Sequence, residues 1–128
     1  MRRTLVALVL VLAFPAVASA TRYVRLGLAA NGSTAHMHVG DALVISLPGH
    51  PDSNYRWVLF PVDTEMLGAG TMSFEAATPD PDGPGTYALG LRAYSAGKTS
   101  LKLGYVLLGH RRREAVRIFS VTVAISKA

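Results

Sequence analysis

The sequence predicts an all-β sandwich of seven or eight short strands, and three observations support this fold class. Apolar and polar residues alternate with a period of two along most of the chain, which is typical of strands with one buried face. Clusters of Gly, Pro, Asn and Asp separate the alternating segments at short intervals, as turns do. Beyond the first twenty residues, no segment of ten or more carries the apolar stripe of an amphipathic helix.

The strands of the first half are expected at 22–28, 34–39, 42–47 and 55–60. Turn signals lie between them, with Asn31-Gly32 after the first strand and Gly40-Asp41 after the second. The third strand alternates most regularly and places Leu43, Ile45 and Leu47 on one face. This face is expected to point into the core.

The strands of the second half are expected at 72–77, 86–93, 100–107 and 115–126. Their expected inward residues are Leu89, Leu91, Ala93, Leu101, Leu103, Tyr105, Phe119, Val121, Val123 and Ile125. Ser95 to Lys98 is a turn, and the stretch 78–85, with three prolines and two glycines, is a surface loop. Strand patterning resumes on both sides of that loop, so a single domain is predicted.

The first twenty residues have the features of a cleaved secretory signal. Arg2 and Arg3 precede an apolar run over 5–14, and Ala-Ser-Ala at 18–20 fits a signal-peptidase site. The apolar run is shorter than the roughly 20 residues of a membrane span. We therefore expect a mature chain of residues 21–128 in the periplasm or outside the cell, with no membrane attachment after cleavage.

The composition of the mature chain excludes some classes of function. The protein has no cysteine, so its core must supply stability without disulfides. Loss of Arg2 and Arg3 leaves eleven of the thirteen Lys and Arg residues against eight Asp and Glu, a small excess for a nucleic-acid binder. The basic residues cluster only at 111–113. Nucleic acid is therefore not an expected partner.

The turn His50-Pro51-Asp52-Ser53-Asn54 is the most distinctive motif, because Tyr55 and Trp57 follow it directly. With the preceding strands, the stretch "NGSTAHMHVGDALVISLPGHPDSNYRW" resembles the first half of the chagasin-like inhibitors of cysteine peptidases. The stretches "TYALGLRAYSAGKTSLKLGY" and "FSVTVAI" are similar to later strands of that family. The resemblance covers nearly all of the mature chain.

This resemblance implies an immunoglobulin-like β-sandwich that is not an enzyme, needs no cofactor and acts as a monomer. It also implies that three loops at one end form a wedge for the active-site cleft of papain-like cysteine peptidases. A rigid wedge loses little entropy when it binds. The resemblance therefore predicts an exported, reversible inhibitor, and the alternative is a non-inhibitory interaction module of the cell envelope with the same fold.

The first family loop reads Asn-Pro-Thr-Thr-Gly, and its positions fall on residues 50–54 with Tyr55 after them. Pro51 is kept, Ser53 keeps a hydroxyl, and Asn54 replaces a glycine. Asparagine is a common non-glycine residue in the left-handed conformation, so the loop can keep its shape. An ordinary β-turn without a partner remains an alternative. Trp57 is expected to anchor the core, and a binding role is the alternative.

The other two family loops match less well. The glycine-rich loop falls on Gly83, Pro84 and Gly85, while Gly68 to Gly70 is expected to be an ordinary turn. The family's Arg-Pro-Trp falls on Leu107, Leu108 and Gly109, so none of its residues is kept. The arginines at 111–113 could supply contacts to an acidic partner, or they could form a solvated hairpin end.

The sequence gives little support to catalysis or metal binding. It contains no nucleophile elbow, phosphate-binding loop or dinucleotide fingerprint. His36 and His38 lie two residues apart in a predicted strand and would share a face, which could ligate one metal. No third ligand is near them in the sequence, and a solvent-facing pair is the alternative.

Overall fold

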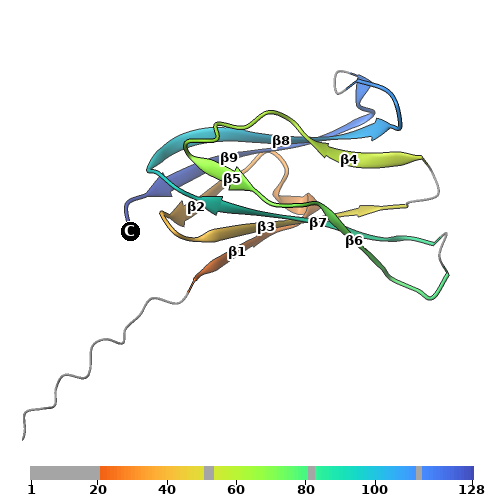
Figure 1. Ribbon diagram of the computed structural model, residues 1–128, viewed down its shortest axis with the longest axis horizontal. Coiled ribbons are helices and arrows are strands. Elements are labelled where there is room, and N and C mark those ends of the chain that lie inside the picture. Colours follow the sequence, from red (N-terminus) through yellow and green to blue (C-terminus); the bar gives the residue numbers. More distant parts are fainter. Residues whose placement is uncertain (1–20, 51–53, 81–82, 112–113) are drawn as a thin grey trace, which may run out of the picture.

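Two β-sheets pack face to face in the computed structural model (Figure 1), which describes residues 21–50, 54–80, 83–111 and 114–128. Within these ranges the chain forms nine strands and one short 3-10 helix, η2. The strands are β1 (Tyr23–Leu26), β2 (Thr34–His38), β3 (Ala42–Gly49), β4 (Tyr55–Leu59), β5 (Leu67–Ala69), β6 (Ser73–Ala76), β7 (Gly85–Ala93), β8 (Gly97–Leu107) and β9 (Arg117–Ser126). The all-β sandwich predicted from the sequence is confirmed, and the expected signal segment 1–20 lies outside the described residues.

The strands divide into two mixed sheets. The first has the order β1-β3-β7-β5, and β6 pairs with β7 beside β5. The second has the order β2-β9-β8-β4. The pairs β1–β3 and β2–β9 are parallel, and the other pairs are antiparallel. The chain passes from the first sheet to the second at the β3–β4 connection, where the first candidate loop lies.

Strand β5 corrects one prediction, because Gly68 to Gly70 was expected to be an ordinary turn. Leu67 to Ala69 instead pairs with β7 along residues 91–93, and Leu67 is fully buried. A Cβ on Gly68 would lie 2.5 Å from the ring of Tyr94, so glycine lets the tyrosine cover the strand. Pairing with a long neighbour thus overrides the turn preference of the glycines.

The strand boundaries differ from the expected ones by a few residues. β8 begins at Gly97, inside the expected 95–98 turn, because its first three residues pair with the end of β9. β9 begins at Arg117 instead of 115, and β1 is shorter than the predicted 22–28 because η2 (Leu28–Ala30) follows it. None of these shifts changes which face of a strand is buried.

The core forms between the inner faces of the two sheets. Leu43, Ile45 and Leu47 of β3 face the four alternating residues of β9 that begin at Phe119, and all are buried. Trp57 is 3% exposed and belongs to the same cluster, which confirms its predicted place in the core. The alternation of the sequence therefore predicts the buried faces of β3 and β9 correctly, whereas near the end of β8 Val106 is buried and the expected inward residue Tyr105 is half-buried.

Candidate functional site

The three candidate loops lie at the same end of the sandwich, on the right in Figure 1. They are the connections β3–β4, β6–β7 and β8–β9. Gly49 at the end of β3 is paired with Gly85 at the start of β7, and Gly85 also faces Ala76 at the end of β6. In the other sheet, Tyr55 at the start of β4 is paired with Leu107 at the end of β8. The strand pairings therefore bring the bases of all three loops together.

The first loop is described at its two ends. Pro51, Asp52 and Ser53 lie outside the described residues, while His50 and Asn54 are exposed. Asn54 has φ = 64°, and among the described residues it is the one non-glycine position with positive φ. The sequence-based expectation that Asn54 takes the left-handed conformation of the family's glycine is thus confirmed.

An aromatic cluster supports the ends of this loop from inside the sandwich. Tyr105 of β8 packs against two rings of β4, with centroid distances of 5.4 Å to Tyr55 and 5.0 Å to Trp57. The indole Nε1–H of Trp57 donates a hydrogen bond of 2.9 Å to the carbonyl of Pro48, near the end of β3. Trp57 therefore fills the core and also links the two sheets next to the loop.

The second loop places its glycines inside and its proline outside. Gly83 and Gly85 are buried and Pro84 is exposed. A Cβ on Gly85 would collide with the carbonyl oxygen of Glu75 and the ring of Phe74. Of the three candidate residues of this loop, Pro84 is thus the one that solvent, or a partner, can reach.

The third loop is joined to the first by the backbone. Leu107 is the last residue of β8, and the N–H of Leu108 donates a 2.7 Å hydrogen bond to the carbonyl of Asn54. Leu108 is 56% exposed, so this loop presents an apolar side chain at a position where the family has Arg-Pro-Trp. Gly109 has φ = 88°, a conformation that disfavours a bulky side chain.

A carboxylate lies beside the start of the basic run in the third loop. The carboxylate of Glu114 accepts the backbone N–H of Arg111 at 2.9 Å and lies 3.5 Å from Nδ1 of His110. Arg112 and Arg113 lie outside the described residues. Glu114 therefore contacts Arg111 and His110, contacts that the sequence pattern did not predict.

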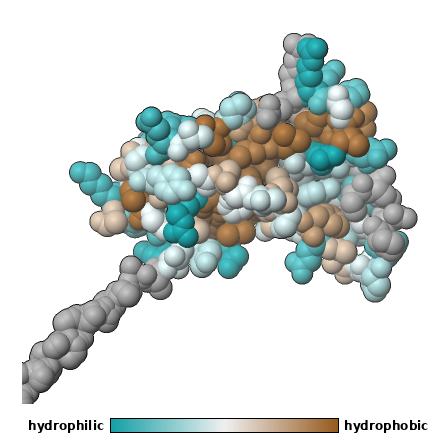
Figure 2. Space-filling model, in the orientation of Figure 1, coloured by the Kyte–Doolittle hydropathy of each residue, from teal (hydrophilic) through white to brown (hydrophobic). Residues whose placement is uncertain are grey.

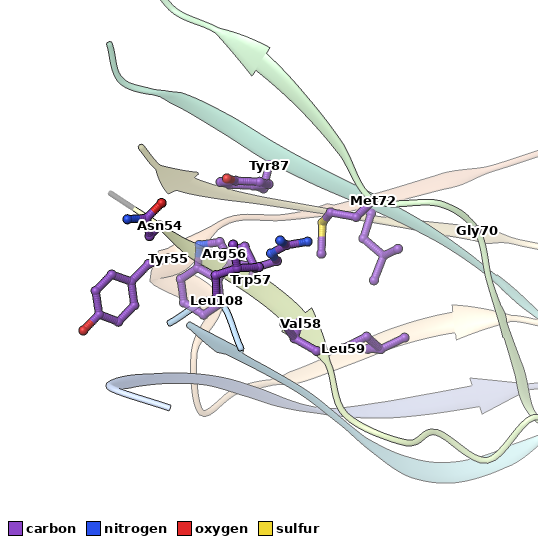
Figure 3. A pocket seen from close by; sticks show the side chains of 11 residues that line it. Asn54, Tyr55, Arg56, Trp57, Val58, Leu59, Gly70, Met72, Tyr87 and Leu108 are labelled. Atoms are coloured by element: carbon purple, nitrogen blue, oxygen red, sulfur yellow. The ribbon is translucent and has the colours of Figure 1, made fainter. Parts of the chain in front are cut away.

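A pocket of about 460 Å³ begins at the same end and was not expected from the sequence (Figure 3). It lies between the edge strand β4 and the β5–β6 edge of the other sheet, and Figure 2 shows apolar surface on this face of the molecule. Apolar lining comes from Trp57, Leu59, Met72 and Leu89, with Arg56 and Tyr87 as polar groups. Since these residues come from separate strands of two sheets, no local motif marks the pocket.

Tyr87 has the one resolved pKa change among the titratable groups described. Burial raises the pKa of its hydroxyl above 10.0, and the nearby Tyr105 raises it further. The guanidinium of Arg56 acts in the opposite direction and lowers this pKa. Tyr87 is therefore a neutral hydrogen-bonding group at neutral pH.

The histidine pair on β2 does not form part of a metal site in the described part of the chain. His36 and His38 are both exposed, while Ala35 and Met37 between and beside them are buried. No group of three or more His, Asp or Glu side chains in the described ranges is arranged to hold a metal ion. His38 instead lies 3.7 Å from the carboxylate of Asp41, which also accepts the His38 backbone N–H.

No helix of the described residues has the length and apolar character to cross a membrane.

The fold is a small β-sandwich with the three candidate loops at one end, and comparison with known proteins gives its family. Residues 36–123 match the chagasin family peptidase inhibitor I42. The chain therefore belongs to this family of protease inhibitors, which are not enzymes.

Three similar proteins illustrate the relationship. Amoebiasin-2 of Entamoeba histolytica is 30% identical over 98 residues, which cover 73% of this chain and 77% of that protein. The crystal structure of the cysteine protease inhibitor EhICP2 from Entamoeba histolytica has a TM-score of 0.71 at 22% identity, covering 84% of this chain and 99% of that one. The structure of PbICP-C in complex with falcipain-2 has a TM-score of 0.53 at 13% identity, with coverage of 85% and 93%. The two structures support the shared fold.

Proposed function

We propose that the mature protein is a reversible inhibitor of papain-like cysteine peptidases and that it blocks the active-site cleft with the loop end of the sandwich. The observation that carries this proposal is the meeting of the three loop bases through the Gly49–Gly85 and Tyr55–Leu107 pairings in a chain of the chagasin family. The complex of PbICP-C with falcipain-2, a papain-like cysteine protease, supports a partner of this class.

The proposed contacts are residues 50–55 of the first loop, Gly83 to Gly85 of the second, and Leu107 to Gly109 of the third. Pro84 is the exposed residue of the second loop, and in the third loop Leu108 and Gly109 are exposed. Exclusion of substrate from the cleft needs no covalent bond, so inhibition depends on shape and on buried apolar contacts. A monomer suffices, because all three loops come from one chain.

The direct test is a titration of residues 21–128 against papain with a fluorogenic peptide substrate. We expect complete inhibition with a Ki in the micromolar range or below. Leu108→Ala is expected to raise Ki about fivefold, which corresponds to ~1 kcal/mol of lost contact. Leu28→Ala, a matched change of an exposed leucine outside the three loops, is expected to leave Ki unchanged. No inhibition by the unaltered chain at about 100 µM, in the upper part of the micromolar range, would reject the proposal.

Export is part of the same proposal and rests on the signal-like features of residues 1–20. We expect the full chain, produced in a bacterial host, to reach the periplasm with Thr21 as its first residue. N-terminal sequencing of the periplasmic fraction tests this. Recovery of the intact chain in the cytoplasm alone would contradict it.

The alternative function is a non-inhibitory interaction module, and the third loop favours it. Leu107, Leu108 and Gly109 replace the Arg-Pro-Trp expected from the family, and arginine and tryptophan are frequent hot spots of interfaces. A pull-down with the mature protein from a periplasmic extract separates the two functions. Recovery of a papain-like peptidase supports inhibition, whereas non-peptidase partners together with a negative papain assay support the module.

A further inference from the structure

The end of β3 is attached to the opposite sheet immediately before the first loop. Pro48 and Gly49 are the last residues of β3, and His50 follows them. On one side of Gly49, the Pro48 carbonyl accepts the indole N–H of Trp57 at 2.9 Å. On the other side, the His50 backbone N–H donates to the hydroxyl of Tyr105 with an N···O distance of 3.4 Å. Two side chains of the second sheet thus bond to the residues on either side of Gly49.

Tyr105 occupies the centre of this attachment. Its ring contacts Trp57 and Tyr55, so packing fixes the direction in which its hydroxyl points. Its hydroxyl would lie 3.5 Å from a Cβ on Gly49, and the ring of Tyr87 would lie only 2.6 Å from the same Cβ. Gly49 therefore leaves the space in which the two tyrosines reach the base of the loop.

The same tyrosine is tied to the third loop through its backbone. Its carbonyl accepts the N–H of Val116, where the chain returns from the third loop toward β9. It is paired directly with Arg117, whose guanidinium lies 5.7 Å from the centroid of the Trp57 ring. A shift of Tyr105 would thus change the base of the first loop and the return of the third loop together.

We infer that Tyr105 is a positioning residue for the binding end, with its hydroxyl holding the His50 end of the first loop in a fixed place relative to the third. This inference rests on the proposed function, because it concerns the geometry that the wedge presents to a peptidase. Loops held before binding lose less conformational freedom on association. Tyr105 itself need not touch the peptidase.

The test uses Tyr105→Phe, which removes the hydroxyl and keeps the ring that packs on Trp57. We expect Ki for papain to rise about threefold, a modest effect because the hydrogen bond is long. The exchange rate of the His50 backbone amide in the free protein is expected to rise by a similar factor, since its acceptor is lost. The thermal midpoint should change little, because the ring packing remains. Tyr94→Phe is the matched control, since Tyr94 is 55% exposed and follows the end of β7 away from the loops.

The amide measurement separates this inference from the proposed function. A chain that does not inhibit papain rejects the proposed function, and the His50 amide still decides whether Tyr105 holds the loop. Unchanged exchange at His50 in Tyr105→Phe would overturn the inference even where inhibition is strong. Faster exchange with an unchanged Ki would overturn it too, because the held geometry would then have no effect on binding.

Discussion

At the residue scale, the glycines of the candidate loops differ in what they do. Gly109 supplies a positive φ, whereas Gly85 supplies space, since a side chain there would meet Glu75 and Phe74. The family comparison treats both positions as loop residues. Their local geometry shows that Gly85 is buried at the base of the β6–β7 hairpin and that Pro84 beside it is exposed.

We predict that Gly85→Ala destabilises the protein by about 1–3 kcal/mol, because the new methyl group overpacks the start of β7. The matched control is Gly90→Ala in the same strand, where nothing lies within 4 Å of the added Cβ. That control should be neutral or slightly stabilising, by about 0.5 kcal/mol, since alanine reduces the freedom of the unfolded chain. Urea unfolding followed by tryptophan fluorescence measures both. Equal losses in the two variants would contradict the steric explanation.

The sequence was informative for residues whose role depends on their own chemistry. Asn54 could be assigned to the left-handed conformation because few other side chains adopt it. Trp57 could be assigned to the core because it lies in an alternating strand. Its bond to Pro48, nine residues away, could not be predicted, because that bond depends on how two sheets face each other. The same limit applies to the hydroxyl of Tyr105 and the backbone of His50, 55 residues apart.

At the element scale, β5 shows where local preference fails. Its sequence, Leu-Gly-Ala, lacks alternation and has a glycine at its centre, so it has no strand signal of its own. The neighbouring strand β7 is nine residues long and offers pairing to both β5 and β6. Between the Ala69–Leu91 and Ser73–Ala88 pairs, the β5–β6 side has one residue more than β7, which is the count of a β-bulge. A strand such as β5 can therefore be predicted only when the strand with which it pairs, here β7, is known.

We predict that Leu67→Ala costs about 2–5 kcal/mol, as expected for a leucine that is fully buried in a core. The control Leu28→Ala removes the same atoms from a leucine that is 38% exposed, and its cost should remain below about 1 kcal/mol. Chemical unfolding of both variants measures the difference. A cost at Leu67 as small as that at Leu28 would show that β5 is not an integral part of the sandwich.

At the scale of the whole molecule, the meeting of the three candidate loops at one end is a consequence of topology. The alternating pattern predicts two apolar faces, and the family resemblance predicts loops at one end. The strand order connects the apolar faces with the loop end. The first loop joins β3 of one sheet to β4 of the other, so it crosses the edge of the shared core. The pocket beside β4 has no counterpart in the sequence analysis, since it lies between edges that only the assembled sheets create.

This topology leads to a prediction about the fate of the inhibitor. The strands on both sides of the first loop, β3 and β4, contribute side chains to one buried core, which anchors the two ends of the loop. We expect inhibition that is competitive with substrate and reversed by dilution, with the chain intact after hours in excess over papain. Mass spectrometry measures whether the chain stays intact, and dilution assays measure whether inhibition is reversible.

Papain with an alkylated active-site thiol should still bind detectably, because no covalent step is needed. Cleavage between Gly49 and Tyr55 accompanied by recovery of papain activity would identify the loop as a substrate and contradict the wedge.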